Sequence, residues 1–315
     1  MDKTFTVSTS PHLKVREDTS TIMWVVNLAL LPSAVASVYL FGLRSLFVIL
    51  VSSAVCVAAE VLSQLAFKRT ITLFDGSALL TGILFAFNLP PTAPVWMIAI
   101  GSFIAIFLVK QLFGGLGYNI FNPALAARAV LLASWPVAMT TWTQPVSAFS
   151  LADAVTTASP LGLVKEAMRA GIAPDLPFGY IDLFLGKIPG SLGETCKAAL
   201  LAGGVVLIAV KIIDWRIPVS FVAAVAVLSL IFGRDPLFEV LSGGLILGAF
   251  YMATDPVTSP TTRKGRVVFG AACGLLTTLT RNFGGFPEGV CYSILFMNML
   301  TPLLEQYFRP RRFGT

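Results

Sequence analysis

The sequence predicts an all-α integral membrane protein of about ten transmembrane helices, arranged as two inverted five-helix repeats with broken helices. Three observations favour this class: little charge, long apolar runs, and a set of motifs that occurs twice. Of the 315 residues, 56% are hydrophobic and 12% are charged, and the mean hydropathy is +0.83. A soluble domain is typically about 25% charged because its surface must be solvated. Most of the surface of this chain is therefore expected to face lipid or protein.

The apolar runs give the number of spans. Ile22 to Gly42 and Ser45 to Phe67 are each about 20 residues long, enough to cross roughly 30 Å of hydrocarbon. With the weaker runs, the predicted spans are 22–42, 45–67, 77–90, 95–113, 120–136, 197–213, 217–233, 238–253, 267–281 and 289–304. Several are short and interrupted by Gly or Pro. Such backbone is tolerated at membrane depth only where protein or a water-lined cavity satisfies its polar groups.

The distribution of Lys and Arg predicts the orientation. If the N-terminus is inside, 14 of these residues lie in inside segments and seven in outside segments, while Arg128 lies within a span. This bias favours both termini in the cytoplasm. The expected location of the chain is the cytoplasmic (inner) membrane of a bacterial or archaeal cell. The net charge of +6 then reflects topology and not nucleic-acid binding. The expected segments are a cytoplasmic tail (1–21), a first membrane repeat (22–137), an extracytoplasmic loop (138–196), a second membrane repeat (197–304) and a cytoplasmic tail (305–315).

Composition also excludes several kinds of chemistry. The four cysteines are scattered without a CxxC pair, and the only histidine is His12 in the N-terminal tail. No zinc or iron–sulfur site built by this chain alone is expected, and Ser–His or Cys–His catalysis in the membrane core is excluded. The chain has no GxGxxG dinucleotide fingerprint, so no dinucleotide site of that kind is expected within it.

Two stretches of the chain match each other. The segment GILFAFNLPPTAP at 82–94 matches GAFYMATDPVTSP at 248–260, and a Phe-Gly-Gly follows each copy, at 113–115 and 283–285. Five predicted spans separate the copies, so they would lie in opposite orientations. Inverted repeats with Pro- or Gly-interrupted segments are typical of transport folds whose functional path lies between the repeats. The alternative is chance recurrence in a chain rich in Gly and Pro.

One motif in the long loop carries candidate chemistry. The loop contains enough Leu, Phe and Pro to favour a packed lid, and within it 153–161 reads DAVTTASPL. From the residues alone, Ser159 is a helix N-cap with Pro160 at the first helical position, followed by a short helix over 161–168.

The same motif resembles the flavin attachment site of the D subunit of Rnf complexes and of the B subunit of sodium-pumping NADH:quinone reductases. That site reads Asp-x-x-Ser-Gly-Ala-Thr, and a dedicated flavin transferase esterifies its last hydroxyl with the phosphate of FMN, using FAD as donor. Asp153, Thr156 and Ala158 match it, and Ser159 takes the place of the acceptor Thr. Thr157 replaces the Gly, so a second hydroxyl stands nearby and the acceptor is either Ser159 or Thr157.

The resemblance extends over about residues 75 to 304. Further blocks that resemble the family are FNPALAAR at 121–128, GSLGETC at 190–196, MATDPVTSP at 252–260, PEG at 287–289 and MN at 297–298. The resemblance implies covalent FMN and a second, non-covalent flavin (riboflavin). It also implies electron relay between reduced ferredoxin and NAD through partner subunits, including a second FMN-carrying subunit and iron–sulfur subunits, coupled to export of Na+ or H+.

Two other interpretations stay open. The first is the B subunit of the quinone reductases, which usually has a longer N-terminal extension than the roughly 21 residues that precede the first span here. A flavin-free channel or transporter could use the same inverted repeat, with the long loop as its lid.

Polar residues within or beside the spans are further candidates, because ionisable groups at such depth are rare and usually functional or paired. Arg128 is a candidate partner for a flavin phosphate or an acidic group, and Asp255 for an ion path or a flavin pocket. The Asn119/Asn122 and Thr254/Asp255 breaks are the expected place of riboflavin. Capping of broken helix ends explains the asparagines equally well.

Overall fold

The computed structural model describes residues 18–145, 156–171, 178–285 and 287–309, and most of these are helical. The first half contains α1 (Thr19–Phe41), α2 (Leu43–Ala66), the 3-10 turn η1 (Leu73–Asp75), α3 (Ser77–Phe87), α4 (Val95–Phe103), the π-helix η2 (Ile104–Gln111) and α5 (Pro123–Ser134). The second half contains α9 (Lys197–Ala209), α10 (Arg216–Ile231), α11 (Pro236–Leu241), α12 (Leu245–Leu247), the π-helix η3 (Gly248–Met252), α13 (Arg263–Phe283) and α14 (Val290–Tyr307).

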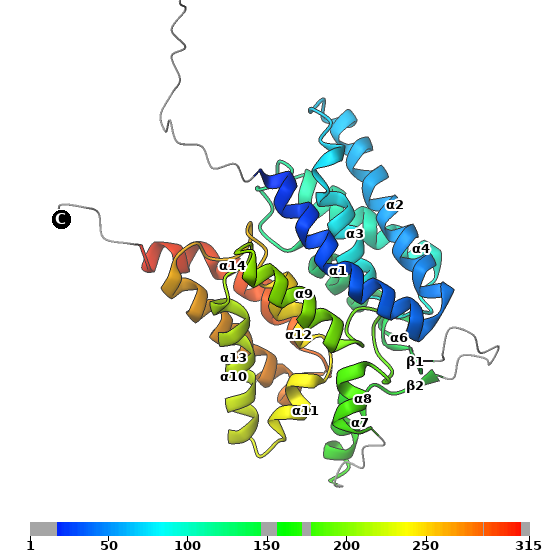
Figure 1. The fold of residues 1–315 in the computed structure, drawn as a ribbon, viewed down its shortest axis with the longest axis vertical. Coiled ribbons are helices and arrows are strands. Elements are labelled where there is room, and N and C mark those ends of the chain that lie inside the picture. The colour runs from blue at the N-terminus through cyan, green and yellow to red at the C-terminus, as the bar shows by residue number, and fades with distance from the viewer. Residues whose placement is uncertain (1–17, 146–155, 172–177, 286, 310–315) are drawn as a thin grey trace, which may run out of the picture.

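The two halves lie side by side and meet through corresponding helices. In Figure 1 the blue and cyan helices of the first half occupy one side and the yellow to red helices of the second half the other. The first helices of the halves, α1 and α9, contact each other, and so do the last, α5 and α14. A two-fold relation between the halves would produce contacts of this kind.

Helices occupy all ten predicted spans, as single helices or as chains of short ones. Within the described residues, α1 and α2 are long and apolar enough to cross a membrane by themselves. The others are shorter or more polar: α3 has 11 residues and α5 has 12. The structure therefore supports an all-α membrane protein, and the count of ten crossings stays a prediction.

The predicted breaks are present in both halves. Residues 88–94 and 253–262 are non-helical, and most of them are buried. The π-helix η3 ends directly at the second break, whereas the nine residues of α4 separate η2 from the first. Because π-helical turns are rare and often mark functional positions, the second break is a candidate site.

The described parts of the loop between the halves, 138–145, 156–171 and 178–196, form a packed lid, which agrees with the expectation from composition. It contains α6 (Pro136–Thr140), a two-residue antiparallel pairing of β1 (Trp142–Thr143) with β2 (Thr156–Thr157), α7 (Pro160–Arg169) and α8 (Tyr180–Leu185). Leu161, Val164 and Leu183 of the lid are buried against Phe238 and Leu241 of α11. In Figure 1, α7 and α8 lie opposite the side where α1 begins and α14 ends.

Three of the positive charges counted for the orientation are buried. Lys110 lies within η2, and Lys197 and Arg281 lie on α9 and α13, each at most 2% exposed. If these three residues are left out, the inside segments lose one positive charge and the outside segments lose two. The bias toward cytoplasmic termini therefore does not depend on them.

Candidate functional site

Ser159 lies where the sequence predicts a helix start. Its backbone is extended and its Oγ accepts a hydrogen bond from the Gly162 N–H at 3.2 Å, which makes it the N-cap of α7, with Pro160 as the first helical residue. The capping prediction is thus confirmed. The half-buried hydroxyl also faces a cavity beneath the lid.

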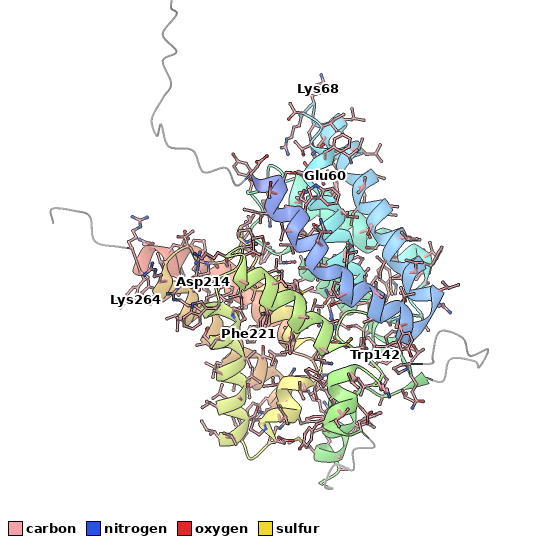
Figure 2. The ribbon with its side chains drawn as sticks, in the orientation of Figure 1. Glu60, Lys68, Trp142, Asp214, Phe221 and Lys264 are labelled. Atoms are coloured by element: carbon pink, nitrogen blue, oxygen red, sulfur yellow. The ribbon has the colours of Figure 1, made fainter. Side chains whose placement is uncertain are left out.

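This lid cavity combines an apolar wall with a charged floor. About 570 Å³ of its space is free of atoms, including space open to solvent. Its lining includes Leu132, Met139, Trp142, Leu161 and Ile188 on the apolar side, and Arg128, Glu194 and Glu288 on the charged side. Trp142 of β1, which belongs to the lid, is labelled at the right of Figure 2.

Arg128 of α5 is held by groups from two distant segments. Its Nη2 forms an ion pair with Glu288 Oε2, and its Nη1 donates to Asn88 Oδ1 at 2.7 Å. Glu288 Oε1 in turn accepts from the Gly244 N–H at 3.0 Å. The predicted acidic partner of Arg128 is therefore Glu288.

A second carboxyl, Glu194, lies beside this ion pair. It is 4% exposed, and its Oε1 accepts from the Ser191 N–H at 2.8 Å, whereas its buried Oε2 has no partner among the described residues. Burial and the neighbouring Glu288 raise the pKa of Glu194 to about 8. Burial acts on Glu288 in the same direction, but it is outweighed by the combined effect of Arg128, the hydrogen bonds with Glu194 and the Gly244 N–H, and Arg281. Together these lower the pKa of Glu288 to about 2. The two carboxyls thus differ in protonation at neutral pH.

A second cavity lies at the breaks. Its lining includes Asn119, Asn122, Thr254 and Asp255, so the structure brings together all four residues proposed for riboflavin. About 750 Å³ of it is free of atoms, including space open to solvent. Lys110 also lines this break cavity.

The charge of Lys110 is neutralised within the protein. Its Nζ contacts Glu60 Oε1 at 2.7 Å and donates to Ser77 Oγ at 2.6 Å, and Gln111 Nε2 donates to Glu60 at 3.0 Å. Glu60 lies on α2, toward the top of Figure 2 and far from Trp142. The ion pair therefore belongs to the end of the first half that is remote from the lid.

Helix α5 and Asn88 connect the two cavities. Asn122 caps the start of α5 by accepting from the N–H groups of Ala124 and Leu125, and Arg128 follows six residues, about 9 Å, along the helix. Asn88, the partner of Arg128, donates to Met252 Sδ at 3.8 Å, and Asn122 donates to the Met252 carbonyl at 3.4 Å. Hydrogen bonds through Asn88 and Met252 thus link Arg128 of the lid cavity to Asn122 of the break cavity.

The residues around Ser159 fit a phosphate ester. A phosphate on its Oγ would lie at the N-terminus of the ten-residue helix α7, where free N–H groups and the helix dipole favour an anion. The apolar wall of the lid cavity has the chemical character that an aromatic ring system requires. When bound, FMN would supply the electron-carrying chemistry that the side chains of this chain lack.

The other motif residues differ in what can be said of them. Asp153 lies outside the described residues, and of Thr156 only the backbone pairing with Thr143 is described. Ala158 is exposed. The Thr157 Oγ1 is buried without a partner among the described residues and does not line the lid cavity, in contrast to the Ser159 hydroxyl.

Sequence reasoning did not identify the carboxyls of the lid cavity as site residues. Glu194 and Glu288 lie within the blocks GSLGETC and PEG, which were recognised only as resembling the family. The sequence did not show that the two carboxyls lie together, because they stand in blocks far apart along the chain. The same holds for Arg128 and its partner Glu288, which are 160 residues apart. The recurrence of an acidic residue in two such blocks was the available signal.

The fold and the two cavities together define an all-α membrane protein with a charged site beneath a lid. A sequence profile of the NQR2, RnfD, RnfE family matches residues 6–314, and the chain belongs to that family.

Curated relatives match over nearly their full length. The D subunit of a proton-translocating ferredoxin:NAD(+) oxidoreductase complex from Clostridium ljungdahlii is 48% identical, covering 99% of this chain and 96% of the relative. The D subunit of a Na(+)-translocating ferredoxin:NAD(+) oxidoreductase complex from Acetobacterium woodii is 47% identical, covering 98% and 95%. The D subunit of an ion-translocating oxidoreductase complex from Stutzerimonas stutzeri is 40% identical, covering 95% and 93%.

Proposed function

We propose that this chain is the membrane flavoprotein subunit of an Rnf-type ferredoxin:NAD+ oxidoreductase and carries FMN as a phosphoester on Ser159. The single observation that carries the proposal is the position of the Ser159 hydroxyl, at the N-terminus of α7 and on the lid cavity. The family and the names of the relatives supply the electron-transfer context. The chain acts as a relay and not as a complete enzyme.

Each part of the site has a role in this proposal. The N-terminus of α7 stabilises the phosphate, and the lid side chains Trp142, Met139 and Leu161 enclose the ring system and exclude water. Arg128 contributes a fixed positive charge at the cavity floor. A covalent link retains a flavin on the outer face, where the cytoplasmic pool could not replace it.

Flavin labelling of defined variants tests the acceptor. When the chain is produced together with a flavin transferase, mass spectrometry should find FMN on the peptide that contains Ser159. Ser159→Ala should abolish this mass and the in-gel fluorescence while the protein stays in the membrane, because the variant loses only a capping hydrogen bond, worth about 1 kcal/mol. Ser159→Thr should retain the label, since it restores a hydroxyl.

Thr157→Ala is the matched control for the neighbouring hydroxyl. It should retain the label, because Thr157 does not line the lid cavity. Label that persists in Ser159→Ala and vanishes in Thr157→Ala would move the acceptor by two residues. Label unaffected by either variant would contradict covalent attachment at this motif.

We further propose that the break cavity holds the non-covalent riboflavin. Its polar groups, Asn119, Asn122, Thr254 and Asp255, can hydrogen-bond the ring edges while Phe250 and Tyr251 contribute aromatic lining. Flavin extracted by denaturing Ser159→Ala protein should be riboflavin in about equimolar amount. Its loss in an Asp255→Asn variant that keeps covalent FMN would support this position, and full retention in that variant and in Asn119→Ala would oppose it.

The proposal includes the rest of the complex and its ion. The partners would be a second FMN-carrying subunit and iron–sulfur subunits, and the coupling ion would be Na+ or H+. Relatives of nearly equal identity are named for each ion, so similarity does not distinguish Na+ from H+ as the coupling ion. Quinone-reductase B subunits remain an alternative because the family includes NQR2. A flavin-free transporter is excluded once covalent flavin is found.

A further inference from the structure

The floor of the lid cavity brings two buried carboxyl groups to one glycine. Glu194 precedes α9 and Glu288 precedes α14, yet a Cβ placed on Gly244 would meet Glu194 Oε2 at 3.2 Å and Glu288 Oε1 at 3.8 Å. Two ionised carboxylates cannot remain this close in a buried position without a strong penalty, so such a pair retains a proton.

The hydrogen bonds show which oxygen is available for that proton. Both oxygens of Glu288 are occupied, by the Gly244 N–H and by Arg128, and Glu194 Oε1 is occupied by the Ser191 N–H. Glu194 Oε2 is the oxygen without a donor among the described residues. A proton on this atom can be donated to Glu288.

Several charged groups face this carboxyl from the surrounding elements. They are Glu288 from the loop before α14, Arg128 from α5, Lys197 from α9 and Arg281 from α13. Arg281 is occupied by Glu239 and the Ser242 carbonyl, whereas Lys197 is fully buried and its Nζ has no hydrogen-bond partner among the described residues. The charged groups around the two carboxyls therefore do not form a complete set of pairs.

We infer that the Glu194–Glu288 pair binds one exchangeable proton at Glu194 Oε2, and that this proton offsets negative charge introduced into the lid cavity. The location of the proton follows from the geometry alone. Its link to electron transfer rests on the proposed function, because that assigns FMN to the cavity.

The direction of the effect follows from linkage. Below about pH 8 Glu194 is protonated, because burial and Glu288 raise its pKa to about 8. Negative charge in the cavity makes this proton harder to remove, and by reciprocity the bound proton makes electron uptake in the cavity easier. As pH rises through 8 the proton leaves and electron uptake becomes harder. Glu194→Gln cannot show this change, because an amide does not titrate in this range.

Infrared spectroscopy of the flavin-free protein tests the proton itself. In the full-length Ser159→Ala chain, the spectrum at pH 6 should contain a protonated carboxyl band that disappears as the pH passes about 8. Adding Glu194→Gln should remove the band, whereas adding Glu166→Gln, which alters an exposed carboxylate of the same lid, should not. A band that persists in Glu194→Gln would overturn the inference.

A second variant guards against misfolding of Glu194→Gln. Lys197→Gln removes the unpartnered cation beside the pair and should shift the titration of the same band to higher pH. Lys187→Gln removes an exposed lysine from the lid and should leave the titration unchanged. Equal titration curves for both lysine variants would contradict the inferred position.

Redox titration separates this inference from the proposed function. In FMN-loaded chain, the midpoint potential should fall more steeply between pH 7 and 9 in the unmodified protein and in Glu166→Gln than in Glu194→Gln. Equal slopes with covalent FMN present would overturn the role of the proton and leave the proposed function intact. Absence of FMN would refute the proposed function, and the infrared result would still decide the position of the proton.

Discussion

At the scale of single residues, a buried charge is tolerated only where partners satisfy its polar atoms. Arg128 is 6% exposed, and the guanidinium has its Nη atoms engaged by Glu288 and Asn88, while its Nε has no partner among the described residues. Burying an ion pair is costly, and the structure tolerates it only because most of the polar atoms are satisfied. A charge fixed in this way suits a role in a site better than a role in stability.

Replacing Arg128 tests this balance. Arg128→Met should lower the free energy of unfolding by about 3–5 kcal/mol, because it leaves the Glu288 carboxylate buried and uncompensated. The double variant Arg128→Met, Glu288→Met should recover most of this loss, because an apolar pair can replace an ion pair. Denaturation in detergent provides the measurement, with the exposed Arg169→Met as control. Additive losses in the double variant would show that the pair is not coupled.

At the scale of elements, glycine sets how closely the two halves approach. A Cβ on Gly203 of α9 would clash with the Ala29 carbonyl oxygen of α1 and with the Tyr251 hydroxyl. That hydroxyl donates to the Leu200 carbonyl at 2.9 Å. Small residues that allow backbones to approach are a common means of packing helices within membranes.

A larger residue at this contact should separate α1 from α9. Gly203→Val should destabilise the protein by at least about 1–3 kcal/mol, since the clash is with backbone that cannot move aside easily. Gly285→Val is the matched control, because nothing lies within 4 Å of a Cβ at that position. Thermal unfolding of both variants compares them, and equal midpoints would mean that the halves do not meet as described.

At the scale of the whole molecule, local signals were predictable and long-range pairings were not. The start of α7 at Ser159 and Pro160 and the non-helical breaks follow from local backbone chemistry, so the sequence predicted them correctly. Glu60 lies within the predicted span 45–67, but nothing in that span indicates its partner Lys110, which is 50 residues away. The same limit applies to Glu194 and Glu288, because no pattern within one segment indicates which distant charge will lie beside it.

The orientation of the whole molecule can be tested with two lysines on opposite sides. Lys187 is exposed beside α8 in the lid, and Lys264 is exposed at the start of α13, at the left of Figure 2. The Lys/Arg bias predicts that the lid is outside and that the start of α13 is inside. In intact cells, a membrane-impermeant maleimide should therefore label Lys187→Cys directly and Lys264→Cys only after permeabilisation.

Native thiols should interfere little with this labelling, because Cys56, Cys273 and Cys291 are buried and Cys196 is only partly accessible. The unmodified chain gives the background, and Lys68→Cys, at the exposed end of α2 in Figure 2, is a second position that should need permeabilisation. Labelling of Lys264→Cys and Lys68→Cys from outside, with Lys187→Cys protected, would invert the topology. The lid cavity would then face the cytoplasm, where free flavin is available. Covalent attachment would not be needed there to retain FMN.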